Sequence, residues 1–189
     1  SIPPVGAVAP YRSADQQRVV ETLQAHLGRR NPTPVVLTAD RGRGKSAALG
    51  LVAAQLLQQG AQVLVTAPSQ GAVEALFNIA QQHWPGCERT PAALCNAGVR
   101  LAFQLPDQIL AASPPADILL VDEAAAIPAP VLQRLLLCYR KVIFASTIHG
   151  YEGTGQGFNL RFRRVLERHC PGWRALTMCQ PVRWAAGDP

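Results

Sequence analysis

The segment from Val35 to Ser46 constrains the fold of this chain more than any other. Four strand-prone residues, VVLT, lead into a glycine-punctuated turn, and GKS then opens a long apolar run of helical character. A strand, a glycine turn and a helix N-terminus in this order gather backbone N–H groups around one point, where they bind phosphate. We therefore expect Lys45 to bridge the β and γ phosphates of a nucleotide and Ser46 to be a ligand of Mg²⁺.

The strict pattern of such a loop has glycine where this chain has Ala39. The departure is tolerable because the first position mainly needs a small side chain. An unoccupied structural turn is the alternative interpretation, and the flanking strand and helix argue against it.

A second motif supplies the acidic half of such a site. Asp122 and Glu123 directly follow the apolar run ILLV, which is typical of a buried strand. We expect Asp122 to hold Mg²⁺, directly or through water, and Glu123 to orient and deprotonate the attacking water. The alternative is an acidic pair that satisfies backbone N–H groups at a helix start.

Apolar runs that alternate with helical patterns predict a parallel sheet covered on both faces. The expected fold is a three-layer α/β domain of the RecA-like P-loop NTPase type with a mostly parallel central sheet. The stretch 84–98 has no clear period and is expected to be irregular, and 150–157 is expected to be a glycine-rich loop. Strands are expected over 35–38, 62–66, 99–103, 117–121, 142–146 and 173–178, and helices over 13–27, 46–59, 71–83, 130–139 and 158–169.

Composition bounds the class of protein. With 48% hydrophobic and 16% charged residues, the 189-residue chain has the balance of one globular domain, expected over 13–189 after a Pro-rich arm over 1–12. The arm and the absence of an initiator methionine lead us to expect a segment of a longer protein. No apolar run approaches the ~20 residues of a membrane span. Five cysteines without a CxxC pair fit a reducing cytoplasm.

Several polar residues have two interpretations each. Gln16 pairs with Ser13 in a capping box, and its amide also suits the edge of adenine. Ser146 and Thr147, at a strand end, either supply a polar group that senses the γ-phosphate or cap the strand. The net charge of +6, carried mainly by arginine, suits a polyanionic partner. Arg161, Arg164 and Arg168 share a helix face that contacts phosphates of ATP or RNA, or is simply solvated.

Together these segments resemble the ATPase/helicase-like module of the tRNA(Met) cytidine acetyltransferase family. The resemblance covers nearly the whole chain, from Asp15 to Pro189, and its most specific motifs are DEAAAIP (122–128) and GYEGTG (150–155). It also includes TADRGRGKSAALG (38–50) and PVRW (181–184).

The resemblance implies an NTPase module of an enzyme that acetylates the wobble cytidine of elongator tRNA(Met) with acetyl-CoA and hydrolyses ATP or GTP. It also implies an N-terminal domain before this module and an acetyltransferase domain after it in the same polypeptide. The acetyl-CoA signature does not occur in these residues, so we do not expect this segment alone to transfer acetyl groups. The nucleotide contacts that it implies are Gln16, Ala39, Asp40, Arg41, Gly42, Arg43, Gly44, Lys45, Ser46, Ala47, Ala48, Asp122 and Glu123.

One departure from the family bears on activity. The family usually has arginine after GTG, whereas this chain has Gln156, and an amide cannot stabilise phosphate charge as a guanidinium does. Either Arg161 or Arg183 substitutes, or hydrolysis is weak. Two hypotheses therefore remain open: an NTPase that positions tRNA, and a non-hydrolysing nucleotide switch that binds RNA. A free-standing helicase is disfavoured, because such motors close ATP between two RecA-like lobes.

Overall fold

Eight strands form a single sheet in the part of the chain that the computed structural model describes, residues 9–40, 44–148 and 153–179. Their spatial order is β3-β4-β5-β2-β6-β7-β1-β8. The strands are β1 (Val35–Asp40), β2 (Val63–Thr66), β3 (Glu88–Thr90), β4 (Ala93–Asn96), β5 (Val99–Phe103), β6 (Ile118–Val121), β7 (Val142–Ile148) and β8 (Arg174–Met178).

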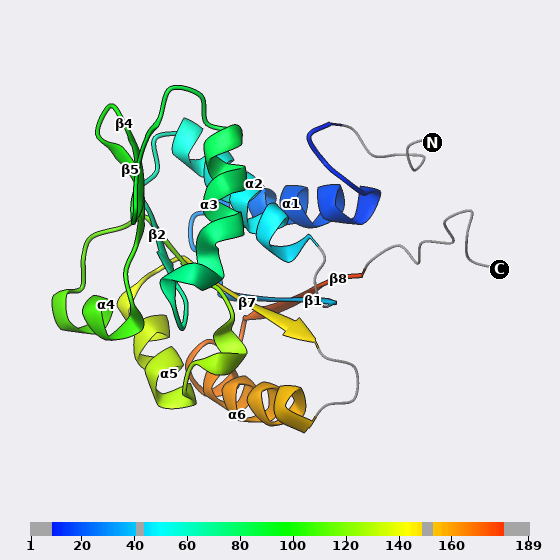
Figure 1. Cartoon of the computed structure of the whole chain (residues 1–189). Helices are drawn as coiled ribbons and strands as arrows, with labels where there is room; N and C mark the ends of the chain where they lie inside the picture. The colour runs from blue at the N-terminus through cyan, green and yellow to red at the C-terminus, as the bar shows by residue number, and fades with distance from the viewer. Residues whose placement is uncertain (1–8, 41–43, 149–152, 180–189) are drawn as a thin grey trace.

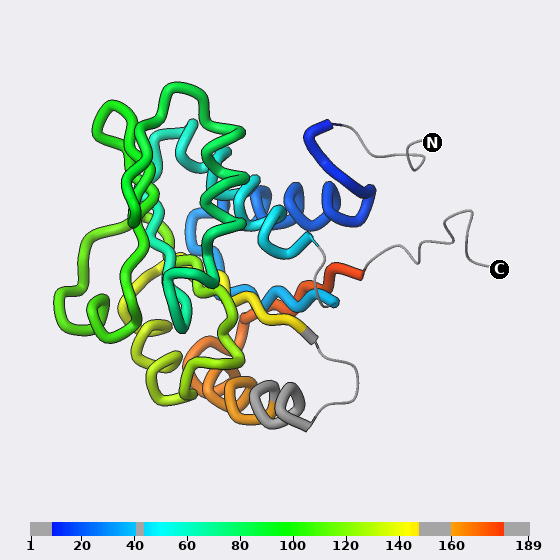
Figure 2. Tube along the Cα trace, in the orientation of Figure 1, coloured from blue at the N-terminus to red at the C-terminus, as the bar shows by residue number. Residues whose placement is uncertain are grey.

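The helices lie in two layers, one on each face of the sheet (Figure 1). The first layer holds α1, α2 and α3, and the second holds α4, α5 and α6; the tube in Figure 2 shows the same separation. Their bounds are α1 (Ala14–Leu27), α2 (Lys45–Gln58), α3 (Glu74–Gln82), α4 (Pro106–Ala112), α5 (Ala129–Cys138) and α6 (Gly153–His169), with 3₁₀ turns η1 (Gln70–Val73) and η2 (Ala124–Ala126).

The central strands are parallel and buried on both faces. β1 pairs in parallel with β7 and β8, and β6 pairs in parallel with β2 and β7. Successive side chains of β6 point to opposite layers, so Ile118 and Leu120 join the core under α1–α3 while Leu119 and Val121 join the core under α4–α6. This two-sided burial explains the continuous apolar runs in the sequence, and it confirms the expected three-layer α/β fold.

Parallel pairing also decides where polar residues gather. The adjacent strands β2, β6, β7 and β1 each have a polar residue at or next to the carboxyl end, so these residues lie at one edge of the sheet. They are Thr66, Asp122, Thr147 and Asp40. The carboxyl edge of an open α/β sheet is the usual place for a ligand.

Three predictions of local structure need correction. The stretch 84–98 is ordered, because β3 and β4 form an antiparallel hairpin that pairs with β5. Helix α4 occupies a stretch between 104 and 116 for which no helix is expected from the sequence. The expected loop over 150–157 is helical from Gly153 onward, while 150–152 lies outside the described residues. Glycine lowers helix propensity by about 1 kcal/mol, but the apolar contacts of α6 outweigh that penalty.

Candidate functional site

The phosphate loop begins where β1 ends and closes where α2 begins. Gly44 stands directly before α2 in the left-handed conformation, with φ of 81°, which glycine adopts without strain. Its carbonyl accepts a hydrogen bond from the Ala48 amide at 2.7 Å, the first turn of the helix. The N-terminus of α2 therefore lies at the carboxyl edge of the sheet, where its unpaired N–H groups favour an anion.

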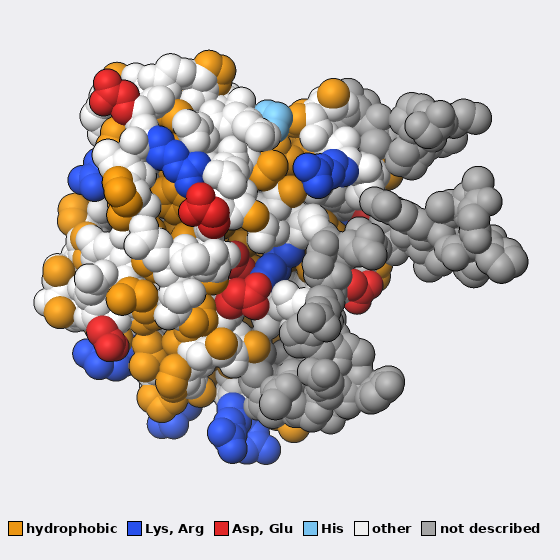
Figure 3. All heavy atoms as spheres, in the orientation of Figure 1, with side chains coloured by type: hydrophobic (Ala, Val, Ile, Leu, Met, Phe, Trp, Pro, Cys, Tyr) orange, Lys and Arg blue, Asp and Glu red, His pale blue; other side chains and the backbone are white. Residues whose placement is uncertain are grey.

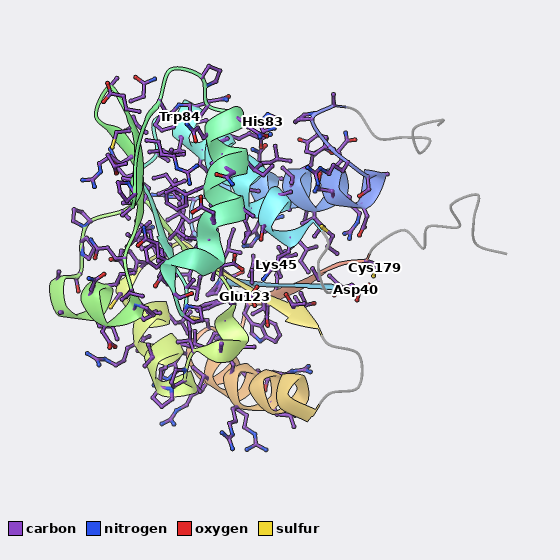
Figure 4. The ribbon with its side chains drawn as sticks, in the orientation of Figure 1. Asp40, Lys45, His83, Trp84, Glu123 and Cys179 are labelled. Atoms are coloured by element: carbon purple, nitrogen blue, oxygen red, sulfur yellow. The ribbon has the colours of Figure 1, made fainter. Side chains whose placement is uncertain are left out.

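Lys45 is the charged centre of this edge. Its side chain is only 6% exposed, and its Nζ lies 2.8 Å from Oδ1 of Asp122 and 2.5 Å from Oε1 of Glu123. The structure thus joins an ammonium from the start of α2 to two carboxylates at the end of β6. Figure 4 shows Lys45 and Glu123 side by side, with Asp40 at the end of β1.

Asp122 is fully buried, and only one of its two carboxylate oxygens has a hydrogen-bond partner among the described residues. Its Oδ1 accepts from the Glu123 amide at 2.8 Å, whereas its Oδ2 has no hydrogen-bond partner within the described part of the chain. Burial raises the pKa of the Asp122 carboxyl, and the nearby Lys45 ammonium opposes that rise. A buried carboxylate oxygen without a partner is a fitting ligand for a hard cation such as Mg²⁺.

Glu123 is held in an unusual backbone conformation. Its φ of 50° is left-handed, which is uncommon for a residue with a side chain. The side chain is 40% exposed, so water reaches its carboxylate, in contrast to that of Asp122. One acidic residue is therefore buried behind the ammonium and the next is open to solvent.

An open cavity of about 450 Å³ lies in front of these groups. In the space-filling view a basic side chain lies against an acidic one near the middle of the visible face (Figure 3). The residues that line the cavity are Arg12, Asp40, Gly44, Lys45, Ser46, Ala47, Ala75, Asn78, Ile79, Glu123 and Thr147. Its size and mixed lining suit a nucleotide-sized ligand.

Gln16 lies behind the loop, and its side-chain amide forms hydrogen bonds with backbone groups. Its backbone amide donates to Ser13 Oγ at 3.0 Å, its Oε1 accepts from the Arg12 amide at 2.9 Å, and its Nε2 donates to the Gly44 carbonyl at 3.4 Å. Gln16 is 3% exposed and does not belong to the cavity lining. In this structure it fastens α1 to the phosphate loop.

The other predicted site residues fall into three groups. Ala39 and Ala48 are buried in the core beside the loop, and neither lines the cavity. Arg161 is exposed on α6 and is not among the lining residues. Arg41, Gly42, Arg43 and Arg183 lie outside the described residues, and nothing is described of the side chain of Gln156.

Sequence reasoning missed one wall of the cavity. Ala75, Asn78 and Ile79 lie one turn apart on α3 and face the start of α2, and Arg12 borders the cavity from the segment before α1. The helical spacing of 75, 78 and 79 marks a shared face. Only the packing of α3 against α2, however, aims that face at the site.

Together, the fold and this site define a P-loop NTPase-type α/β domain. A family model described as RNA cytidine acetyltransferase NAT10/TcmA, helicase domain, matches residues 36–189. The chain belongs to that family.

Two relatives illustrate the match. The chain is 50% identical over 188 residues to a tRNA(Met) cytidine acetyltransferase TmcA of Nitrosococcus halophilus, covering 99% of this chain and 25% of the relative. It is 47% identical over 171 residues to the protein of the same name from Vibrio cholerae, covering 90% of this chain and 24% of the relative. The chain thus spans about a quarter of the length of these relatives.

Solved structures agree on the fold. The large terminase of a thermophilic bacteriophage superposes with a TM-score of 0.59 at 12% identity, over 87% of this chain and 45% of that one. The large terminase ATPase domain of Thermus phage P74-26 superposes with a TM-score of 0.50 at 18% identity, over 82% and 78%. Across the described residues, no helix has the length and apolar character needed to cross a bilayer.

Proposed function

We propose that this chain is an ATP- or GTP-hydrolysing, helicase-like module of an enzyme that forms N-acetylcytidine at the wobble position of elongator tRNA(Met). The observation that carries the proposal is the convergence of Lys45, Asp122 and Glu123 in front of an open cavity at the N-terminus of α2. The names of the relatives supply the substrate, tRNA, and the acetyl transfer.

Each residue has a distinct task in hydrolysis. The Lys45 ammonium, which two carboxylates share in this structure, would bridge the β and γ phosphates of a bound nucleotide. The solvent-accessible Glu123 carboxylate is then released to orient the attacking water and accept its proton. Ser46 and the free Oδ2 of Asp122 are the groups that would hold Mg²⁺. When bound, the ion neutralises charge that develops on the phosphates.

The cation is best treated as a shared ligand of protein and nucleotide. No group of three or more His, Cys, Asp or Glu residues able to hold a metal occurs among the residues that the structure describes. Mg²⁺ commonly takes one or two protein oxygens and completes its shell with phosphates and water. The small donor set at Ser46 and Asp122 fits that mode of binding.

The proposed role in the whole enzyme is mechanical. Hydrolysis in this module would reposition the tRNA anticodon for an acetyltransferase domain of the same polypeptide, which would bind acetyl-CoA. We expect the enzyme to act in the cytoplasm.

A turnover assay tests the hydrolysis. With Mg²⁺ and ATP or GTP, the chain should release phosphate, and Lys45→Ala and Glu123→Gln should each lower kcat by at least about 10²-fold, the usual scale for loss of a base or a charge-stabilising group. Lys141→Ala is the matched control, because Lys141 is the other lysine of the chain and does not line the cavity. Equal rates in the wild type and both site variants would refute the proposal.

The non-hydrolysing switch is the second candidate, and Gln156 in place of the family's arginine favours it. It predicts nucleotide affinity that depends on Lys45 without phosphate release, with or without tRNA. Turnover in the wild type excludes it.

A further inference from the structure

The positive charge of this chain is concentrated in one stretch. Residues 129–178 hold eight Lys and Arg residues and only two Asp and Glu residues, an excess equal to the +6 net charge of the whole chain. The preceding 128 residues carry nine basic and nine acidic residues and are neutral overall. The stretch comprises α5, β7, α6 and β8, so the charge falls mainly on the helix layer opposite α1–α3. In Figure 3, basic side chains gather at the lower edge, around the helices labelled α5 and α6 in Figure 1.

Helix α6 presents its arginines directly to solvent. Phe162 and Leu166 are 1% exposed and anchor the helix to the core. At about 100° per residue, Arg161, Arg164 and Arg168 fall within an arc of about 60° on the side opposite those anchors. The three form a stripe about 10 Å long, which we call the arginine stripe.

The members of this stripe differ from their neighbour Arg163. Arg163 donates to Glu167 at 3.1 Å and lies over the ring of Trp173 at 5.9 Å, so its guanidinium is already engaged. Across the described residues, no ion pair or side-chain hydrogen bond is found for any guanidinium of the stripe. Three adjacent, uncompensated guanidinium groups repel one another unless an anion lies between them.

We propose that the arginine stripe binds the phosphate backbone of RNA, which rests on the proposed function and names a surface for its tRNA partner. Guanidinium groups pair with phosphate oxygens in a bidentate manner. A lipid surface would need a broad apolar face beside the charges, whereas Leu160 is the one large apolar side chain found strongly exposed on the described part of α6. Because aromatic side chains are few, at 6% of the chain, binding through phosphates rather than base stacking fits the composition.

The arginine stripe runs away from the edge of the sheet that bears the nucleotide cavity. Helix α6 follows β7, whose last residues include the cavity-lining Thr147, so the first turn of α6 lies toward the nucleotide edge of the sheet and its last turn lies away from it. RNA held along α6 would therefore extend from the side of the molecule where nucleotide is turned over. A conformational change that depends on the nucleotide could therefore act on RNA bound along α6.

The test is a titration of a labelled elongator tRNA(Met) transcript with the chain and its charge-reversal variants at several salt concentrations. Arg164→Glu and Arg168→Glu should each weaken binding several-fold, and the double variant about tenfold or more. The slope of log affinity against log salt should fall in magnitude by about 0.7–0.9 for each phosphate that the variant no longer neutralises. Arg100→Glu on β5 is the charge-matched control, since Arg100 is exposed outside the basic stretch.

Melting temperature and nucleotide affinity distinguish a loss of RNA binding from a loss of folding or of the nucleotide site. Nucleotide affinity should be unchanged in Arg164→Glu and Arg168→Glu, because neither side chain lines the cavity. The melting temperature should not fall, because both side chains are exposed and each change relieves repulsion between like charges. A double variant that binds tRNA no more weakly than Arg100→Glu overturns the proposal. So does loss of binding to polyglutamate with tRNA affinity intact, which would assign the stripe to an acidic protein. Loss of tRNA binding supports the proposal even if the chain hydrolyses no nucleotide.

Discussion

The Asp122 carboxylate is buried but only partly paired. Removing a carboxylate from water is costly unless it is paired and hydrogen-bonded. Here one oxygen contacts the Lys45 ammonium and the Glu123 amide, and the other has no partner among the described residues. The chain thus tolerates a penalty at the position where a cation would be most useful, as is common at functional sites.

This penalty has a pH signature. Because burial raises the pKa of Asp122, the folded chain binds that proton more tightly than the unfolded chain, and stability decreases as the pH rises through the raised pKa. The penalty fades as pH falls through the raised pKa. Asp122→Asn should therefore melt at a higher temperature than the wild type at pH 8, and the difference should shrink as the pH falls through the raised pKa of Asp122.

Circular dichroism melts without nucleotide measure that effect. Glu88→Gln is the control, because Glu88 is exposed on β3 and its neutralisation should change stability by less than about 0.5 kcal/mol. An Asp122→Asn variant that is less stable than the wild type at pH 8 would show that the pair with Lys45 outweighs burial.

At the scale of elements, the contact between α2 and α3 shapes one wall of the cavity. Gly50 lies in the middle of α2, where a side chain would meet α3: an added Cβ would lie 2.7 Å from the Ile79 Cβ and 2.8 Å from the Leu76 carbonyl oxygen. The absence of a side chain lets the two helices approach closely. That approach brings the side of α3 bearing Ile79 to the nucleotide cavity.

Gly50→Ala should therefore destabilise the chain although alanine is the better helix former. The propensity gain is about 1 kcal/mol, whereas overpacking costs about 1–3 kcal/mol. One of the close contacts is a backbone oxygen, which cannot turn aside, so the cost falls in the upper part of that range, at about 2–3 kcal/mol. We expect a net loss of about 1–2 kcal/mol, seen as a melting temperature lower by about 2–8 °C. Gly71→Ala is the control, since nothing lies within 4 Å of an added Cβ there. A Gly50→Ala variant that melts at or above the wild-type temperature would contradict this packing.

The β3–β4 hairpin is attached to the same helix. Arg89 on β3 donates to Asn78 at 2.6 Å, to Gln81 at 2.9 Å and to Glu74 at 3.0 Å, all on α3. Since Asn78 also lines the cavity, one guanidinium orients a cavity side chain and holds the hairpin at the same time. The β3–β4 hairpin thus holds α3, which forms one wall of the cavity.

At the scale of the whole molecule, the site joins elements that nucleotide would bind together. The cavity draws on the segment that leads into α1, on α2 and α3, and on the ends of β1, β6 and β7. Ligand that binds only the folded chain stabilises it by about 2.7 kcal/mol at a concentration 100-fold above its Kd. At that excess, ATP with Mg²⁺ should raise the melting temperature by about 5–10 °C.

Differential scanning fluorimetry checks this shift. Chelation of Mg²⁺ by EDTA and the Lys45→Ala substitution should each remove most of it, while Lys141→Ala should retain it. A shift that persists in Lys45→Ala would place the nucleotide elsewhere on the molecule.

The sequence by itself determined the main plan of the fold and the identity of the charged centre. Continuous apolar runs such as 118–121 can only be buried on both faces, and parallel strands bring their ends to one edge, so Lys45, Asp122 and Glu123 could be expected to meet. Of the other residues predicted around the glycine turn, Asp40, Gly44, Ser46 and Ala47 line the cavity, because the turn chemistry is local.

Tertiary structure alone decided the rest. The hairpin at 88–96 depends on pairing with β5, which no local pattern in such short strands reveals. Asn78 and Ile79 became cavity residues because α2 and α3 pack closely at Gly50, and Gln16 turned its amide to the loop backbone. Periodicity reports which side of an element is buried, but only packing between elements determines what that side touches.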